Sequence, residues 1–468
     1  MLLFSKNKTS INTTTIYNML GVVLLQGISA LTAPIFTRML GANQYGEYGI
    51  FNAWIAVLSS FMGLGVGSTI GTGMYEFKDD YYRFRNSVFI LGVISCFAIT
   101  AMITAFSGFI SRIIHFPEWL VALMPIFSSS IFITGFIQSA LVFEKRPFLN
   151  LLLSVFVSLS TVVTSLVLVA QFPQDSRYLG RIIGSTVPQI IIAIIVGIVF
   201  FFRYPCGYER RYWFFSVSLG MPIVFHILSS RVLTQSDRLM MQYFGIDEAD
   251  IGIYTAFYSF SLVLNTILSA LNSSWVPFYY GYLNEKDADK LNSKSKNYIE
   301  LLTVLSCGFI LLSKEVGRIY AGKEYYSGIG VIPILVLAVF FTFMYQFPVN
   351  FEMYHKKTNI VAVGTFASAI CNIVLNGLLI PVMSLYGAAI ATAISYCLLF
   401  IFHYVNVKYR MSVPFHLNLK LFLIPLCMIS ICMLLFYGVD GMWYLRWEIG
   451  FLIGAYELVK IYKRRSIF

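Results

Sequence analysis

Charged side chains inside an otherwise apolar stretch are the residues of this sequence best suited to chemistry. One such stretch and the few residues after it contain His226, Arg231, Asp237 and Arg238. Arg231, Gln235 and Arg238 have the spacing i, i+4 and i+7, which places them on one face of a helix. Two guanidinium groups on such a face could bind a phosphate, because their planar fork matches phosphate oxygens. We therefore predict that this face lines a water-filled cavity.

Two further arginines lie at the ends of apolar segments. Arg38 ends one segment and Arg181 begins another. Each could contribute to the same phosphate site, or could extend to the membrane interface as arginines near helix ends commonly do. A second alternative is structural, with Asp237 forming an ion pair with Arg231 or with Arg38. The candidate substrate-binding residues are therefore Arg38, Arg181, Arg231 and Arg238.

Three residues are candidate carriers of a coupling proton or cation. Asp237 and His226 follow from their place in the polar helix face, and Glu76 from its place near an apolar boundary. Glu352 has a similar position, near the end of another apolar segment. For Glu76 and Glu352 we favour the alternative that both are exposed groups at the membrane interface.

The sequence contains no motif of nucleotide, metal or nucleophile chemistry. It has no Walker loop, no HExxH and no GxSxG, and its seven cysteines include no CxxC spacing. We expect no metal site, no cofactor and no enzymatic activity. Uncharged polar residues within apolar segments, such as Asn372 and Asn376, are expected mainly to join neighbouring helices by hydrogen bonds.

The elements that must position these residues are helices in a membrane. The chain of 468 residues is 58% hydrophobic and only 12% charged, with a mean hydropathy of +0.76, whereas about 25% of the residues of a soluble domain are charged. Apolar runs of about 20 residues are long enough to span a bilayer as helices, and barrel strands are much shorter. The fold class is therefore an all-α polytopic membrane protein with 12–14 transmembrane helices. Fourteen segments are predicted: 16–37, 48–72, 87–111, 119–142, 149–172, 179–202, 213–235, 252–277, 299–320, 329–351, 359–381, 385–407, 418–437 and 443–461.

The distribution of basic residues predicts the orientation. If both termini lie on the cytoplasmic side, the cytoplasmic loops hold more than two-thirds of the 33 Lys and Arg residues, as the positive-inside rule requires. The net charge of +11 is therefore a topology signal and does not indicate nucleic-acid binding.

A weak internal repeat predicts two matching lobes. Gly46, Tyr48 and Phe51 align with Gly252, Tyr254 and Phe257 at one constant offset, and a Gly-containing helix start at Gly180 recurs at Gly387 at nearly the same offset. Six helices separate the copies, so the lobes have the same orientation and are related by an axis along the membrane normal. We predict two pseudo-symmetric six-helix bundles at 1–208 and 209–411, with an additional helix pair at 412–468. Chance similarity among Gly- and Tyr-rich helix starts is the alternative.

Several of these stretches resemble the polysaccharide repeat-unit flippases, often called Wzx. The resemblance covers the first twelve segments, and it is specific only in the combination of its parts. Its parts are Pro34 to Gly41, Tyr45 to Tyr48, Ser236-Asp237-Arg238, Ile251 to Tyr254, Trp275-Val-Pro277, Ala321 to Tyr326, Lys356-Lys357-Thr358, Asn372 with Asn376, and Gly387 to Thr392.

The resemblance implies a member of the multidrug/oligosaccharidyl-lipid/polysaccharide exporter superfamily. Such a flippase turns undecaprenyl-diphosphate-linked oligosaccharide from the cytoplasmic to the periplasmic leaflet for O-antigen or other surface polysaccharide. It also implies a location in a bacterial cytoplasmic (inner) membrane, and a polysaccharide polymerase and a chain-length regulator as partners. Related lipid II flippases have arginines in the first helix, whereas residues 16–37 here carry no charge. That departure argues against a lipid II flippase and leaves the diphosphate-binding residues open.

Two other function classes are compatible with the sequence. An ion-coupled exporter of small molecules or drugs would share the two-lobe architecture. A membrane glycosyltransferase or polymerase would need a large polar catalytic loop, and the loops here are short. Transport by alternating access is the function that the sequence favours.

Overall fold

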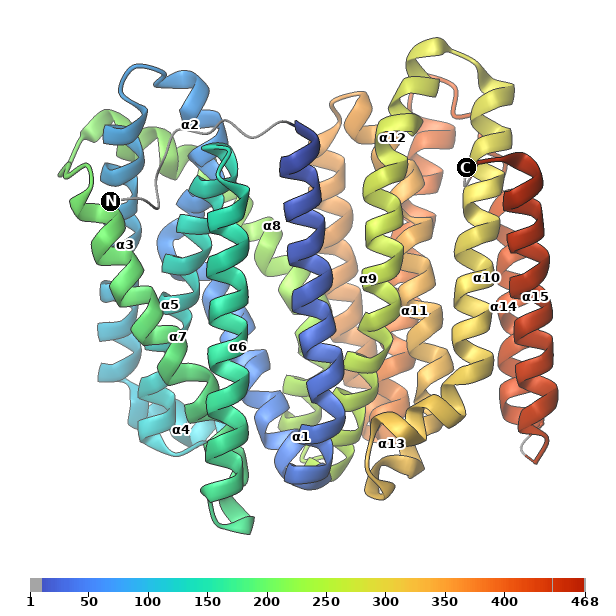
Figure 1. Ribbon diagram of the computed structural model, residues 1–468, viewed down its shortest axis with the longest axis horizontal. Helices are drawn as coiled ribbons and strands as arrows, with labels where there is room; N and C mark the ends of the chain where they lie inside the picture. Colours follow the sequence, from blue (N-terminus) through green and yellow to red (C-terminus); the bar gives the residue numbers. More distant parts are fainter. Residues whose placement is uncertain (1–10, 440, 467–468) are drawn as a thin grey trace. The chain divides into compact units, whose positions relative to one another are not determined.

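The computed structural model describes residues 11–439 and 441–466, and this part of the chain contains helices and short turns but no β-strand (Figure 1). This confirms the all-helical prediction. The first half consists of α1 (Ile11–Phe61), η2 (Met62–Thr69), α2 (Ile70–Glu76), α3 (Tyr81–Ala105), α4 (Ser107–Ile114), α5 (Glu118–Phe143), α6 (Pro147–Gln171), η3 (Gln174–Ser176), α7 (Arg177–Phe202) and α8 (Arg210–Tyr243). The second half consists of α9 (Glu248–Glu285), α10 (Ala288–Tyr320), η4 (Lys323–Val331), α11 (Ile332–Met344), α12 (Gln346–Tyr354), α13 (Thr358–Val405), η5 (Asn406–Arg410), α14 (Lys420–Gly438) and α15 (Trp443–Arg464).

Ten helical stretches within the described residues are long and apolar enough to cross a membrane. In α1 and in α13, two consecutive predicted segments are joined without a loop, because the chain bends while its helix continues. The bends are at Gly41 in α1, with φ 72°, and at Ser384 in α13, with φ 47°. Each of the other predicted segments falls on described helices, although α10 and α15 are not among the ten.

The chain forms two compact units. The N-terminal unit contains the described residues up to Thr32 and Glu47–Gln235, and the C-terminal unit contains Ala33–Gly46 and the described residues from Ser236 onward. The second predicted segment therefore begins where the chain returns to the N-terminal unit. The lobe boundaries given above stay a prediction.

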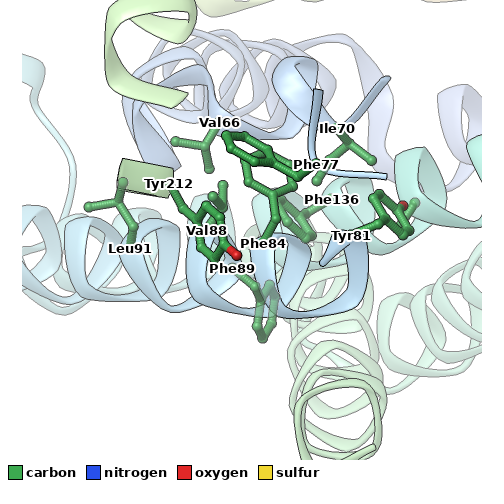
Figure 2. Packing of buried hydrophobic residues seen from close by; sticks show 11 residues of the cluster. Val66, Ile70, Phe77, Tyr81, Phe84, Val88, Phe89, Leu91, Phe136 and Tyr212 are labelled. Atoms are coloured by element: carbon green, nitrogen blue, oxygen red, sulfur yellow. The ribbon is translucent and has the colours of Figure 1, made fainter. Parts of the chain in front are cut away.

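The N-terminal unit has an aromatic core where η2, α2, α3, α5 and α8 meet. Phe77 stacks on Phe84 with ring centroids 4.8 Å apart, and Tyr212 packs edge-on against Phe77 at 4.9 Å. Figure 2 shows these rings together with Val66, Ile70 and Phe136, all buried. Offset and edge-to-face ring pairs each contribute roughly 0.5–1.5 kcal/mol beyond area burial, so this cluster fixes the short helix α2 against α3.

The repeat glycines meet in the C-terminal unit. A Cβ atom at Gly46 would lie 2.0 Å from the carbonyl oxygen of Glu248, and one at Gly252 would lie 1.9 Å from the carbonyl oxygen of Ala42. Each contacted carbonyl belongs to the residue four positions before the opposite glycine, so the contact is reciprocal. The helix starts therefore cross at backbone distance, which only residues without a side chain allow. This gives the Gly46–Gly252 part of the repeat a structural reason.

Charged residues of α15 are paired with α10. Arg446 is 1% exposed and donates to a carboxylate oxygen of Glu315, while Lys460 and Arg464 contact Glu300. Their partners lie more than 100 residues away in the sequence. These charged residues lower the hydropathy of segment 443–461, and they attach α15 to α10.

Candidate functional site

Asp237 is the centre of a buried polar cluster in the C-terminal unit. It lies near the end of α8 and is 0% exposed. Its Oδ2 accepts hydrogen bonds from the Tyr254 hydroxyl of α9 at 2.5 Å and from Thr392 of α13 at 2.9 Å. Its Oδ1 accepts from the Asn376 amide of α13 at 2.8 Å. Three donors from two other helices therefore compensate much of the cost of burying this carboxylate.

The cluster continues along α13. The Oδ1 atom of Asn372 accepts from Ser236 at 2.7 Å and from Asn376 at 3.1 Å, and both asparagines are 0% exposed. This is the interhelical role expected for them. Two buried atoms, Asn372 Nδ2 and Asn376 Oδ1, have no hydrogen-bond partner within the described part of the chain. Buried amide groups without partners are rare. The cluster therefore still has a donor group and an acceptor atom available for further hydrogen bonds.

Arg238 lies beside Asp237 in the sequence but points to different partners. It is 4% exposed, its Nε donates to Thr255 at 3.1 Å, and its guanidinium lies 4.5 Å from the ring centre of Tyr258 and 5.5 Å from that of Tyr254. Tyr254 thus contacts both charged residues. Buried cations stacked on aromatic rings are stabilised by the ring quadrupole.

The equivalent repeat tyrosine of the N-terminal unit is also covered by an arginine. The guanidinium of Arg181, at the start of α7, lies 5.0 Å from the ring centre of Tyr48. Arg181 is half-buried. Each unit therefore stacks one of the predicted substrate-binding arginines on its own repeat tyrosine, a relation that the sequence spacing does not reveal.

The remaining predicted residues are solvent- or lipid-accessible within their own units. Arg231, His226 and Glu76 are exposed. Arg38 is also exposed, and its guanidinium donates to the carbonyl oxygens of Pro34 at 2.7 Å and Ile319 at 2.5 Å. The face of α8 that carries Arg231, Gln235 and Arg238 thus passes from exposed through half-buried to buried.

The predicted alternative of an ion pair at Asp237 is wrong. Within the described residues, neither Arg38 nor Arg231 forms an ion pair with Asp237, whose bonded partners are instead a tyrosine, a threonine and an asparagine. A phenol, a hydroxyl and an amide supply the hydrogen bonds without a second full charge. Hydropathy and helical spacing cannot predict this, because the partners come from other helices.

The prediction that Glu352 is an exposed interfacial group is wrong. It lies on α12, is 0% exposed, and its Oε2 is 2.7 Å from Nδ1 of His403, which is also 0% exposed. Asn406 donates to its Oε1 at 2.8 Å. His403 was not among the predicted residues, because no spacing signal links it to Glu352. A His within the apolar segment 385–407 was the only sign.

These contacts define what the chain can do chemically. No group of three or more His, Cys, Asp or Glu side chains suited to a metal ion occurs among the described residues. The C-terminal unit instead holds buried charged groups on helices that span a membrane. Such groups are expensive in an apolar environment and usually mark ion or substrate pathways.

The fold is that of membrane transporters. It resembles a solved structure of the lipid II flippase MurJ in an inward closed conformation, with a TM-score of 0.72 and 18% identity over 97% of this chain and 99% of that one. It also resembles an inward-facing multidrug resistance MATE family transporter of the MOP superfamily, with a TM-score of 0.62 and 14% identity over 87% of this chain and 95% of that one. The class is therefore a polytopic membrane protein with a flippase- or exporter-type fold.

Sequence comparison specifies the family. Residues 12–280, more than half of the chain, match the family described as polysaccharide biosynthesis protein, and the chain belongs to this family. An uncharacterized membrane protein of Haemophilus influenzae is 22% identical over 393 residues, which cover 79% of this chain and 92% of that protein. The predicted resemblance to flippases of polysaccharide synthesis is thus confirmed at the level of family and fold.

Proposed function

We propose that this protein is a flippase that moves undecaprenyl-diphosphate-linked oligosaccharide repeat units from the cytoplasmic to the periplasmic leaflet by alternating access. The observation that carries the proposal is that two adjacent charged residues, Asp237 and Arg238, are both buried on the membrane-spanning helix α8, in a chain of the polysaccharide biosynthesis family. Sugars and a diphosphate cannot cross hydrocarbon unaided. Charged groups kept within the spanning helices are what such a headgroup requires.

The diphosphate is assigned to the four predicted arginines, with different roles. In this proposal the direct phosphate ligands are Arg231, which is exposed, and Arg181, which is half-buried against Tyr48. Arg38 and Arg238 are held by protein groups and contribute positive charge that also favours an anion. Guanidinium groups suit this task because they stay charged and bind phosphate in a bidentate manner.

Asp237 is the coupling residue in this proposal, ahead of His226 and Glu76. Its carboxylate is buried and held by donors from two other helices, whereas His226 and Glu76 are exposed. A proton or a monovalent cation that neutralised Asp237 would weaken its hold on Tyr254, Asn376 and Thr392 and so change how α8, α9 and α13 pack. A ligand shifts such an equilibrium only by its differential affinity for the two states.

The proposed location is a bacterial cytoplasmic (inner) membrane, with both termini cytoplasmic. The substrate would come from lipid-linked sugar synthesis for O-antigen or another surface polysaccharide. A polysaccharide polymerase and a chain-length regulator would act on the translocated unit.

Deletion of the gene in its host tests the proposal. A flippase predicts loss of the surface polysaccharide and accumulation of complete lipid-linked units on the cytoplasmic leaflet. The intact gene should restore the polymer, Arg231→Ala should not, and Arg210→Ala, at an exposed position in the first turn of the same helix, should restore it. Immunoblots for each variant separate lost function from lost protein.

An ion-coupled exporter of small molecules is the second candidate, and its support is the fold shared with a multidrug resistance transporter. For this function the deletion would leave surface polysaccharide and lipid-linked units unchanged while it increased drug sensitivity. A glycosyltransferase or polymerase has less support, since the loops between the described helices are short.

A further inference from the structure

The N-terminal unit has a groove that is lined by none of the substrate-binding or coupling residues assigned above. It is a cavity of about 360 Å³ formed by α3, α5, α6 and α7. Most of its lining is aliphatic or aromatic. Leu152 and Phe156 of α6 and Val199 of α7 are about half exposed, at 48%, 58% and 54%, and they form part of its wall. On helices that span a membrane, such a wall is in contact with hydrocarbon.

One end of this groove is basic. Arg85, Arg146 and Arg203 line it together with a single acid, Glu144. These four residues come from the start of α3, the turn between α5 and α6, and the end of α7. The four helices run alternately up and down, so these positions all lie at the same end of the helices. The basic mouth is therefore at one membrane interface.

The single acid is already engaged. Arg85 is 2% exposed, forms an ion pair with Glu144 at 2.5 Å, and stacks 4.0 Å from the ring centre of Phe200. Arg146 Nε is 3.6 Å from the other carboxylate oxygen of Glu144. Arg203 is exposed and lies 5.8 Å from the ring centre of Tyr204. The lining contains three cations and one anion, so this end of the groove carries a surplus of positive charge beside the apolar wall.

We propose that this groove binds one anionic phospholipid of the adjacent leaflet, with an acyl chain along α6 and α7 and the phosphate at Arg146 and Arg203. Basic pockets between transmembrane helices hold anionic headgroups in this way. The apolar wall does not suit a free phosphate, and the charge surplus disfavours a zwitterionic lipid. The site is separate from the proposed transport residues and does not depend on which solute is moved.

Lipid binding to the purified protein tests this proposal. Native mass spectrometry from detergent micelles containing phosphatidylglycerol or phosphatidylcholine would count retained lipids at each concentration. The test variant is Arg146→Gln/Arg203→Gln. Its matched control is Arg210→Gln/Arg211→Gln, two arginines near the start of α8 that do not line the groove. Arg85 is left unchanged because its buried pair supports the fold.

The expected result is that the first phosphatidylglycerol binds more tightly than phosphatidylcholine, and that the test variant weakens it by about tenfold or more. The control should bind it as the unmodified protein does. Leu152→Trp, which keeps the charges but fills the groove, should also remove the first phosphatidylglycerol. This second variant keeps the test informative if the arginine variant does not fold.

Three results would overturn the proposal. One is equal affinity for phosphatidylglycerol and phosphatidylcholine. Another is an equal loss in the test and control variants. The third is displacement of phosphatidylglycerol by equimolar undecaprenyl phosphate, which would make the groove a site for the prenyl carrier instead.

Discussion

Asp237 and Arg238 are adjacent on α8, yet each is stabilised by a different set of neighbours. Asp237 is held by Tyr254, Asn376 and Thr392, and Arg238 by Thr255 and Tyr258. Tyr254 lies between the two sets, because it donates to Asp237 and lies under Arg238. If the charge of Asp237 changes, the position of the Tyr254 ring should change with it, and this would alter the contact between Tyr254 and Arg238.

Substitution of Asp237 should stop transport without unfolding the protein. Asp237→Asn keeps the size and can still accept from Tyr254 and Thr392, but it has no charge to be neutralised. We expect transport to fall at least tenfold while the purified variant stays monodisperse. Asp289→Asn, at an exposed position in the first turn of α10, is the control and should leave transport unchanged. Full transport by Asp237→Asn would remove Asp237 from the coupling role.

The buried pair of Glu352 and His403 should matter for stability. Glu352→Ala would remove the carboxylate that lies 2.7 Å from the buried His403 imidazole and would leave the amide of Asn406 buried without its acceptor, at a cost of about 1–3 kcal/mol. Glu352→Gln keeps an acceptor for Asn406, so it should lose less. Thermal unfolding in detergent measures both. Equal unfolding temperatures for Glu352→Ala and the unmodified protein would show that this contact does not stabilise the fold.

The sequence predicted which residues lie in helices and missed which side chains meet. Hydropathy detects chain segments that tolerate hydrocarbon, so each predicted segment falls on described helices. It cannot detect a partner on another helix. Glu352 is predicted to be exposed, but it is buried in contact with His403, which lies 51 positions later in the chain. Helical spacing grouped Arg231 with Arg238, but packing left one exposed and buried the other.

At the scale of whole helices, the bends within helices and the extensions of helix ends could not be predicted from the sequence either. The bend at Ser384 joins two predicted segments into α13, and Asp250 of α9 accepts from the Ser384 hydroxyl at 2.7 Å. A serine at φ 47° is strained, and this hydrogen bond helps to hold it. Helices also extend past their apolar segments into polar sequence, as the first turns of α10 do. Side chains cap such ends: Asp287 accepts a hydrogen bond from the backbone N–H of Lys290.

The crossing of the two repeat helices should be intolerant of any side chain. In Gly252→Ala the new Cβ would lie 1.9 Å from the carbonyl oxygen of Ala42, so the helices would have to separate. We expect a lower unfolding temperature and loss of transport. Gly281→Ala, on the same helix with nothing within 4 Å of the new Cβ, should be neutral or stabilising by up to about 1 kcal/mol. Equal behaviour of the two variants would refute a close crossing.

At the scale of the whole molecule, the basic loops predict which side each loop faces. Cys206, half-buried in the turn between α7 and α8, is predicted to be cytoplasmic. With the other six cysteines replaced by Ala, a membrane-impermeant maleimide should label Cys206 in inverted vesicles but not in intact spheroplasts. Asp175→Cys, in a Cys206→Ala background, lies in the turn before α7 and should show the opposite pattern. Labelling of Cys206 from outside would reverse the orientation.

Transport of a lipid-linked sugar is the central claim, and reconstituted vesicles test it most directly. Lipid-linked repeat units with a fluorescent sugar would be placed in both leaflets, and a membrane-impermeant quencher added outside. We expect protein-containing vesicles to lose nearly all fluorescence, whereas protein-free vesicles and vesicles with Asp237→Asn should keep about half over the same period. Identical quenching with and without protein, under an imposed proton or sodium gradient, would contradict it.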